Sequence, residues 1–181
     1  MNYETIADIY SANAKVREAL NATLEGITPD EAATLPDDGK WSIQHVVEHI
    51  AMVETGVSMI CSRMIEAAKA DDKTSDGKFV LSPEFLESIS RLVSGTAKVE
   101  APERVQPTGE VAIQDSLRTL TAATATLDSF RGDLESIDVT GHKFPHPFFG
   151  PLTATEWLVI SGLHERRHTA QIESLLTKIR K

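Results

Sequence analysis

The sequence predicts an all-α fold, an antiparallel four-helix bundle with long connecting loops. Four long stretches carry apolar residues at the 3.6-residue period of a helix, and no stretch shows a convincing two-residue alternation typical of a strand. The length of 181 residues favours a single domain over 1–181, and a hydrophobic content of 41% is enough to bury one core. Long amphipathic helices without strands bury their apolar faces against each other, so we expect a bundle.

The N-terminal part of the chain is expected to hold two of the long helices. The first covers about 3–24, where an apolar face is interrupted by the polar side chain of Asn13. A capping box formed by Thr28 and Glu31 then predicts a short helical turn. The second long helix is expected over about 42–70, with a continuous apolar face.

The C-terminal part is expected to hold a short helix over 83–93 and the other two long helices. The third long helix covers about 111–134, after a loop over 95–110 that is rich in proline and glycine. The fourth begins at Thr153, which forms a capping box with Glu156, and runs to the C-terminus. Loops as long as 95–110 are often functional in a compact domain.

Composition and charge exclude several classes of function. A net charge of -9 and a pI of about 5.1 argue against a nucleic-acid partner, which requires a concentrated basic patch. The single cysteine, Cys61, allows no internal disulfide or all-thiolate zinc site, suits a reducing cytoplasm, and is expected to be a small core residue. We expect no signal peptide, because the N-terminus MNYETIADIY has early acidic residues and no apolar h-region. We expect no membrane partner, because no apolar run approaches the roughly 18 residues of a membrane span.

Two histidines on the last helix, His164 and His168, are the first candidate metal ligands. A spacing of four residues turns the helix by about 400°, so both rings leave the same face one turn apart. That face is the apolar stripe of the helix, which turns polar at Ser161, the two histidines and Gln171. One interpretation is a metal site inside the bundle. The other is a hydrogen-bonded core cluster in which Ser161 and Gln171 satisfy the imidazoles.

A third ligand would have to come from another helix, and the second long helix offers His45 and His49. His49 lies about 80° from the centre of its apolar face, whereas His45 lies about 120° away and closer to solvent. We therefore expect His49 to be the ligand and His45 to be a surface residue or an outer partner. Three neutral imidazoles suit zinc, nickel, cobalt or iron and leave a position open for water or substrate.

The string HERRH also matches the H-E-x-x-H pattern of zinc metalloproteases, in which Glu165 would be the general base. The downstream third ligand of those proteases is missing, since Gln171 and Ser174 stand at the metzincin glycine and histidine positions. Glu165 either reaches a metal-bound water as a catalytic residue or pairs with a neighbouring helix.

Two further histidines, His142 and His146, lie in the connection that precedes the last helix. Both are candidates for a fourth ligand or for an acid–base group at the mouth of the site, with His146 as the preferred catalytic candidate. The alternative is that both are ordinary residues of a loop packed by its phenylalanines.

Three segments together resemble the DinB superfamily of DinB/YfiT-like metal-dependent hydrolases. They are WSIQHVVEHI at 41–50, HPFFGPLTATEWL at 146–158 and HERRHTAQI at 164–172. The resemblance implies a four-helix bundle with crossover connections that is often dimeric. It places the metal ligands at His49, His164 and His168 and implies zinc or nickel as the cofactor.

The resemblance implies a metal-dependent enzyme acting on a small molecule, either a hydrolase or a thiol-dependent S-transferase. A transferase would bind a low-molecular-weight thiol as thiolate, and a hydrolase would generate metal hydroxide, at the same three histidines. Two other interpretations stay open: a non-catalytic metal- or small-molecule-binding helical protein, and a structural histidine pair. The loops over 71–82 and 95–110 are candidates for the rim of the site.

Overall fold

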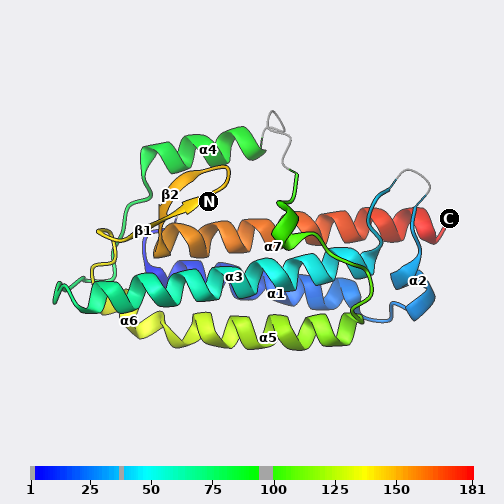
Figure 1. Ribbon diagram of the computed structural model, residues 1–181, viewed down its shortest axis with the longest axis horizontal. Coiled ribbons are helices and arrows are strands. Elements are labelled where there is room, and N and C mark those ends of the chain that lie inside the picture. The colour runs from blue at the N-terminus through cyan, green and yellow to red at the C-terminus, as the bar shows by residue number, and fades with distance from the viewer. Residues whose placement is uncertain (1–2, 37–38, 94–99) are drawn as a thin grey trace.

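Four long helices form the body of the protein in the computed structural model, which describes residues 3–36, 39–93 and 100–181 (Figure 1). They are α1 (Ile6–Leu24), α3 (Ile43–Lys69), α5 (Ile113–Ser129) and α7 (Ala154–Ile179). Helix α3 packs against both α5 and α7, and α1 packs against α7. The predicted four-helix bundle is confirmed. In Figure 1, α1 and α7 run in one direction and α3 and α5 run in the other, so the two pairs are antiparallel to each other.

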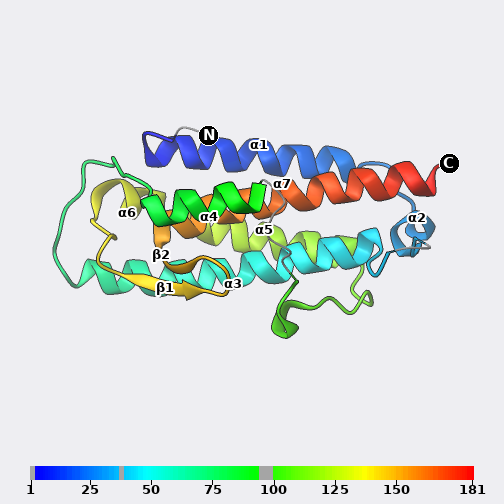
Figure 2. The same cartoon turned by 90° about the horizontal axis from the view of Figure 1, so that it is seen from above.

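The connection from α3 to α5 has to return along the bundle because these neighbouring helices are parallel. It carries the short helix α4 (Pro83–Val93), as predicted, and a 3-10 turn η1 (Glu103–Val105), both lying over the α3–α7 side of the bundle (Figure 2). A short helix α2 (Pro29–Ala33) connects α1 to α3. Segment 71–82, a candidate for the rim, instead forms β-bridges with Thr5 and Ile137. Residues 94–99 of the other candidate lie outside the described part of the chain.

Capping boxes start four of the helices and explain where those helices begin. The predicted boxes at Thr28 and Thr153 are confirmed, and Thr5 and Ser42 form two more. In the box that opens α3, the imidazole of His45 replaces the usual carboxylate, with its Nδ1 2.8 Å from Oγ of Ser42. The Nδ1 atom of His45 is therefore bonded to Ser42 at the start of α3.

The third long helix is shorter than predicted. The apolar periodicity predicted a helix that continues to residue 134. Instead, α5 ends at Ser129, and a separate short helix, α6 (Arg131–Ser136), follows. At Phe130 the backbone N–H bonds back to the carbonyl of Leu127, three residues earlier, so the chain tightens there. The apolar period continues through this break, which is why the sequence did not reveal it.

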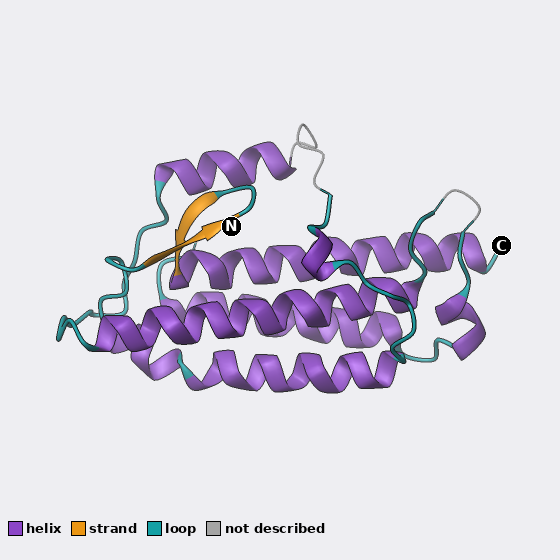
Figure 3. Ribbon diagram, in the orientation of Figure 1, coloured by secondary structure: helices purple, strands orange, loops and turns teal. Residues whose placement is uncertain are grey.

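A small β-hairpin precedes α7, so the expectation that the chain contains no strand is wrong. Strand β1 (Lys143–His146) pairs antiparallel with β2 (Gly150–Thr153), shown in orange in Figure 3. Each strand has four residues, and Pro145 and Pro151 face each other in the register. Strands this short and rich in proline carry no readable alternation, and proline is normally depleted from strands.

The buried apolar side chains of the described residues form two clusters, with polar residues of α3 and α7 between them. One cluster includes Phe85 of α4, Leu152 of β2 and Leu158 of α7, and the other includes Val46 and Ile172 towards the opposite end of the bundle. The polar residues between them are those of the candidate site and of the ion-pair network beside it.

Asn13, which interrupted the predicted apolar face of α1, has a specific partner on α7. Its Nδ2 donates to the carbonyl of Leu158 at 3.0 Å, and its side chain lies over Gly162, where a Cβ would overlap it. The polar residue and the glycine therefore belong to one close helix–helix contact.

Candidate metal centre

Three histidines from two helices meet at one point inside the bundle. Nε2 of His164 lies 3.1 Å from Nε2 of His49 and 3.1 Å from Nε2 of His168. The metal-binding atoms of the three rings all lie within 4.8 Å of one another. His49 is 4% exposed and His168 8% exposed, so water reaches these groups poorly. The predicted set of candidate ligands is thus brought together, and the choice of His49 over His45 agrees with the geometry.

The outer nitrogens of two rings fix where their protons lie. Nδ1 of His49 is 2.7 Å from the carbonyl of Val105, and Nδ1 of His168 is 2.8 Å from Oε1 of Gln171. A carbonyl oxygen only accepts, so both Nδ1 atoms donate and carry the proton of the neutral ring. The inward Nε2 atoms of His49 and His168 therefore present lone pairs.

Neutral imidazoles cannot satisfy each other in this arrangement. His164 can supply at most one Nε2–H to two facing lone pairs, so at least one acceptor is left without a proton. Protonation is disfavoured as well: burial lowers the pKa of all three rings, to about 4 for His168 and well below the ordinary value for His164. The donor set therefore fits a cation. Two imidazole nitrogens on one tetrahedral zinc ion stand about 3.4 Å apart, close to the separations here.

Aromatic and backbone groups complete the walls of the centre. The ring of Trp41 lies 4.9 Å from that of His49 and stacks on that of His168 at 6.4 Å, centroid to centroid. The carbonyl of Val105, the last residue of η1, comes from the crossover connection. Sequence reasoning missed both groups as site residues. The Trp-Ser pair at the start of α3 was a signal for Trp41, whereas no pattern pointed to a carbonyl at Val105.

His146 and His142, the two loop candidates, lie in different places. The ring of His146 packs on Phe149 and Trp157 at centroid distances of 4.6 and 4.9 Å. Burial lowers the pKa of His146 to about 4, with a smaller contribution from Arg104, and a protonated His146 would lower the pKa of His164 further. His142 instead bonds to Asp71, with Nε2 and Oδ2 3.1 Å apart, and belongs to a surface ion pair.

Glu165, the other catalytic candidate, is engaged by α1. Its two carboxylate oxygens accept bonds of 2.7 and 2.5 Å from the guanidinium of Arg17. Arg17 also donates to Thr124 on α5 and lies 3.6 Å from Glu54, which accepts from Ser161. Of the two alternatives for Glu165, the contacts match an acid paired with a neighbouring helix. Ser161, expected beside the imidazoles, belongs to this second cluster.

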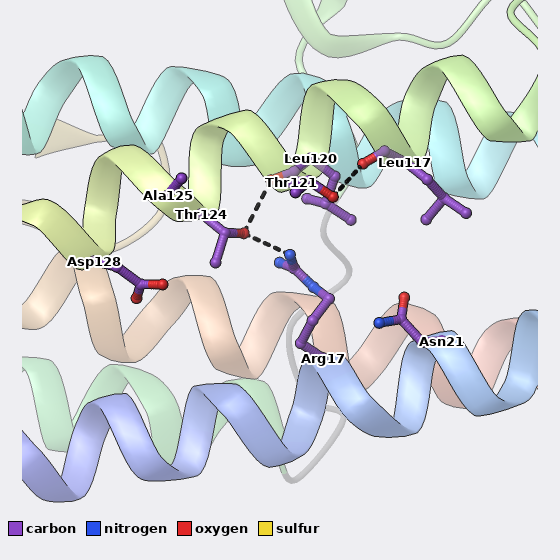
Figure 4. A pocket seen from close by; sticks show the side chains of 8 residues that line it. All are labelled: Arg17, Asn21, Leu117, Leu120, Thr121, Thr124, Ala125 and Asp128. Carbon is purple, nitrogen blue, oxygen red and sulfur yellow. Dashed lines mark hydrogen bonds between the residues drawn. The ribbon is translucent and has the colours of Figure 1, made fainter.

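Arg17 and Thr124, two members of this cluster, line a groove of about 310 Å³ between α1 and α5. Figure 4 shows Arg17 reaching from α1 towards Thr124 on α5, with Asp128 and Asn21 on the walls. None of the residues lining this groove is a histidine. The groove is thus separate from the histidine centre.

Cys61 is a core residue, as predicted. It is 1% exposed, and burial raises the pKa of its thiol. Its Sγ faces the carbonyl of Ala154 at 3.8 Å. A buried thiol of this kind is not a nucleophile.

Comparison with known proteins gives a family match, a related sequence and a related structure. The profile of the DinB superfamily matches residues 12–172. The uncharacterized protein YuaE of Bacillus subtilis (strain 168) is 26% identical over 167 residues, which cover 86% of this chain and 90% of that protein. The crystal structure of TT2238, a four-helix bundle protein, superimposes with a TM-score of 0.63 at 21% identity, over 94% of this chain and 99% of that one. No helix in the described part of the chain is long and apolar enough to cross a bilayer.

Proposed function

Since the chain belongs to the DinB superfamily, we propose that it is a metal-dependent enzyme that acts on a small molecule through His49, His164 and His168. The observation that carries this proposal is the convergence of Nε2 lone pairs that the three rings cannot satisfy among themselves. Zinc and nickel both accept three imidazoles and keep a further position for an exogenous ligand.

Between the two candidate reactions, the surroundings favour thiol transfer over hydrolysis. A bound metal lowers the pKa of a thiol, which then attacks an electrophile as thiolate without a general base. Arg167 acts electrostatically on all three ligand histidines. Among the described residues, the hydrogen-bond partners of the three rings are the carbonyl of Val105, the amide of Gln171 and one another, and none is a carboxylate. In the transfer, the thiol proton goes to solvent, a C–S bond forms, and the leaving group departs with its electron pair.

His146 is the better placed of the two catalytic candidates. Its Nδ1 accepts from the backbone N–H of Phe148, so Nε2 carries the proton of the neutral ring. Burial keeps this ring neutral near pH 7, and its Nε2–H can donate a hydrogen bond to a substrate oxygen. Glu165 remains bound to Arg17 and has no such role in this proposal.

Metal analysis of untagged protein tests the proposal. We expect close to one zinc or nickel ion per chain in the parent and in His142→Ala, and a sharp loss in His164→Ala and His49→Ala. Full metal content in His164→Ala would refute the ligand assignment. Turnover of an electrophile that requires added thiol separates an enzyme from a non-catalytic metal-binding protein, which would bind metal and thiol without turnover. Hydrolysis without thiol would support the hydrolase instead.

The remaining properties are predictions of the same proposal. The single buried cysteine and the small-molecule substrate are consistent with a cytoplasmic enzyme. A homodimer is expected from the resemblance, and sedimentation analysis of the full chain tests it.

A further inference from the structure

Two arginines give the candidate centre a charge opposite to that of the chain. Arg104 lies on η1, directly before the residue whose carbonyl bonds to His49, and Arg167 lies on α7, directly before His168. Both side chains are exposed. The chain as a whole carries a net charge of -9, so two cations beside one site are a local reversal of sign.

Neither arginine is neutralised by the described part of the protein. Neither Arg104 nor Arg167 forms a salt bridge with a described residue, whereas many other basic residues do. Arg167 acts electrostatically on all three ligand histidines, and Arg104 acts on His146. With neutral imidazoles, a divalent ion would add two positive charges to those of the two arginines. A single thiolate or hydroxide would therefore leave a net positive charge at the centre and its two neighbouring arginines.

We propose that the small molecule bound at this centre carries a carboxylate-like anionic group beside its metal-binding atom, and that Arg104 and Arg167 attract that group. This inference rests on the proposed function and specifies its substrate class. Guanidinium groups suit the task, since their planar array of donors matches the two oxygens of a carboxylate. If solvent screened both arginines completely, the charge of a bound molecule would not change its affinity.

Three small thiols of different charge test the proposal on the cobalt-loaded full chain. They are 3-mercaptopropionate, 2-mercaptoethanol and cysteamine, and thiolate-to-cobalt absorption reports the dissociation constant of each. Because the thiols differ in acidity, each constant is compared between parent and variant rather than between thiols. Arg167→Gln and Arg104→Gln are the variants, and Arg166→Gln is the control, since Arg166 is the adjacent exposed arginine on α7.

We expect Arg167→Gln and Arg104→Gln each to weaken the binding of 3-mercaptopropionate but not of the other two thiols. For an assumed separation of about 7 Å between guanidinium and anion, removal of one charge changes affinity about three- to eightfold at an effective dielectric constant of about 40–80. Cysteamine should bind equally or slightly better, 2-mercaptoethanol should be unaffected, and Arg166→Gln should resemble the parent. Equal ratios for all three thiols would overturn the inference while leaving a thiol-binding metal site intact.

Other failures are distinguishable from this one. Absence of cobalt binding would refute the three-histidine site itself. Cobalt binding without a thiolate band would refute the thiol-dependent function. In that case malonate is titrated against the cobalt spectrum, and an affinity that Arg167→Gln does not lower would overturn the anionic preference as well.

A second inference comes from hydrogen bonds rather than charge, at Glu48, the residue before His49 on α3. Its side chain is 6% exposed, and its carboxylate accepts three hydrogen bonds from the crossover connection. Thr108 donates its N–H at 3.1 Å and its hydroxyl at 3.0 Å, and Gly109 donates its N–H at 2.8 Å. We name residues 105–109 the strap.

The strap is fastened to α3 at both ends. Besides the bonds to Glu48, Gln44 donates to the carbonyl of Gly109 at 2.6 Å, and at the other end Val105 accepts from His49. Gly109 has a φ of +74°, and a Cβ there would overlap the ring of His45, so only glycine fits this close approach. The hydrogen bond from His49 to the carbonyl of Val105 sets the tautomer of His49. Val105 belongs to the strap, which Glu48 holds against α3.

We infer that Glu48 is a positioning residue, which holds the strap so that the carbonyl of Val105 keeps the proton of His49 on Nδ1. Groups that orient a ligand in this way usually change metal affinity about ten- to a hundredfold when removed. Glu156 provides a matched control. It is 3% exposed, and its carboxylate likewise accepts from the N–H and hydroxyl groups of Ser82 and Thr153, at a distance from the strap.

Chelator competition on Glu48→Gln and Glu156→Gln tests the role. Both variants should lose some stability, but only Glu48→Gln should lose metal affinity, by about ten- to a hundredfold. Equal affinity in both variants would overturn the inference. Thr108→Val, which removes only the hydroxyl donor, serves if Glu48→Gln does not fold and should show a smaller loss of affinity. In metal-free protein, nitrogen NMR of His49 should show proton transfer from Nδ1 in Glu48→Gln; an unchanged tautomer would contradict it.

Discussion

Two polar clusters share the centre of the bundle, and neighbouring residues on α7 belong to one each. His164 joins two other imidazoles, whereas Glu165 joins Arg17. The cluster around Arg17 contains opposite charges, and its donors and acceptors satisfy one another. The histidine cluster contains like groups whose lone pairs converge. The difference indicates that a buried polar group stabilises a fold when its partners are present within the chain, and indicates a ligand site when they are not.

Removal of Arg17 should have the largest effect on stability. Arg17→Met leaves the carboxylate of Glu165, whose side chain is 5% exposed, without its cation, and Glu54 loses a nearby positive charge. Breaking a buried pair in this way costs about 3–5 kcal/mol. Urea denaturation measures the change. The exposed pair Arg131–Glu135 is the control, because Arg131→Met should cost less than about 1 kcal/mol. If both variants lost the same free energy of unfolding, the ion pairs of Arg17 would not stabilise the fold more than an exposed pair does.

Metal removal should lower stability through the histidine cluster and leave the cluster around Arg17 intact. A ligand at about 1,000 times its dissociation constant stabilises the folded state by about 4 kcal/mol. Chelation should therefore lower the melting temperature of metal-loaded parent protein and of Arg131→Met alike. The same treatment should leave His164→Ala unchanged, because its site is already lost. A chelator-insensitive parent would mean that the histidines are structural.

The contact between α1 and α7 should be sensitive to added volume. Gly162→Ala drives a methyl group into the side chain of Asn13, and overpacking of this kind costs about 1–3 kcal/mol. Asn13→Ala in the same chain relieves the overlap but loses the bond to Leu158. We expect the double variant to be more stable than Gly162→Ala alone. A purely additive loss in denaturation experiments would contradict the proposed contact.

Acidification of metal-free protein should have the smallest effect. The folded-state pKa of His168, about 4, lies below the ordinary value of 6.5, so between these values the unfolded state binds more protons. Stability from this group is therefore fully present above pH 6.5 and falls as the pH drops towards 4. The loss between pH 7 and pH 6 is about 0.7 kcal/mol for one such histidine. His168→Phe should show a flatter pH profile in thermal unfolding.

Local patterns predicted the elements that local physics controls. Capping boxes at Thr28 and Thr153 fixed where two helices begin, because their hydrogen bonds lie within four residues. The four-residue spacing of His164 and His168 on a helix required both rings on one face, and the apolar face of α3 selected His49 over His45. The short hairpin and the break at Phe130 were missed, since proline hides the alternation of one and the apolar period continues through the other.

The sequence by itself therefore determined the bundle, the three candidate ligands and the core position of Cys61, all of which follow from periodicity and from composition. Only the tertiary structure decided the partners: Arg17 for Glu165, the carbonyl of Val105 for His49, and Glu48 for the strap. These pairs are separated by 148, 56 and 61 residues along the chain. Helical periodicity determines which face a side chain occupies, but the identity of its partner depends on how distant segments pack, and no local pattern encodes that.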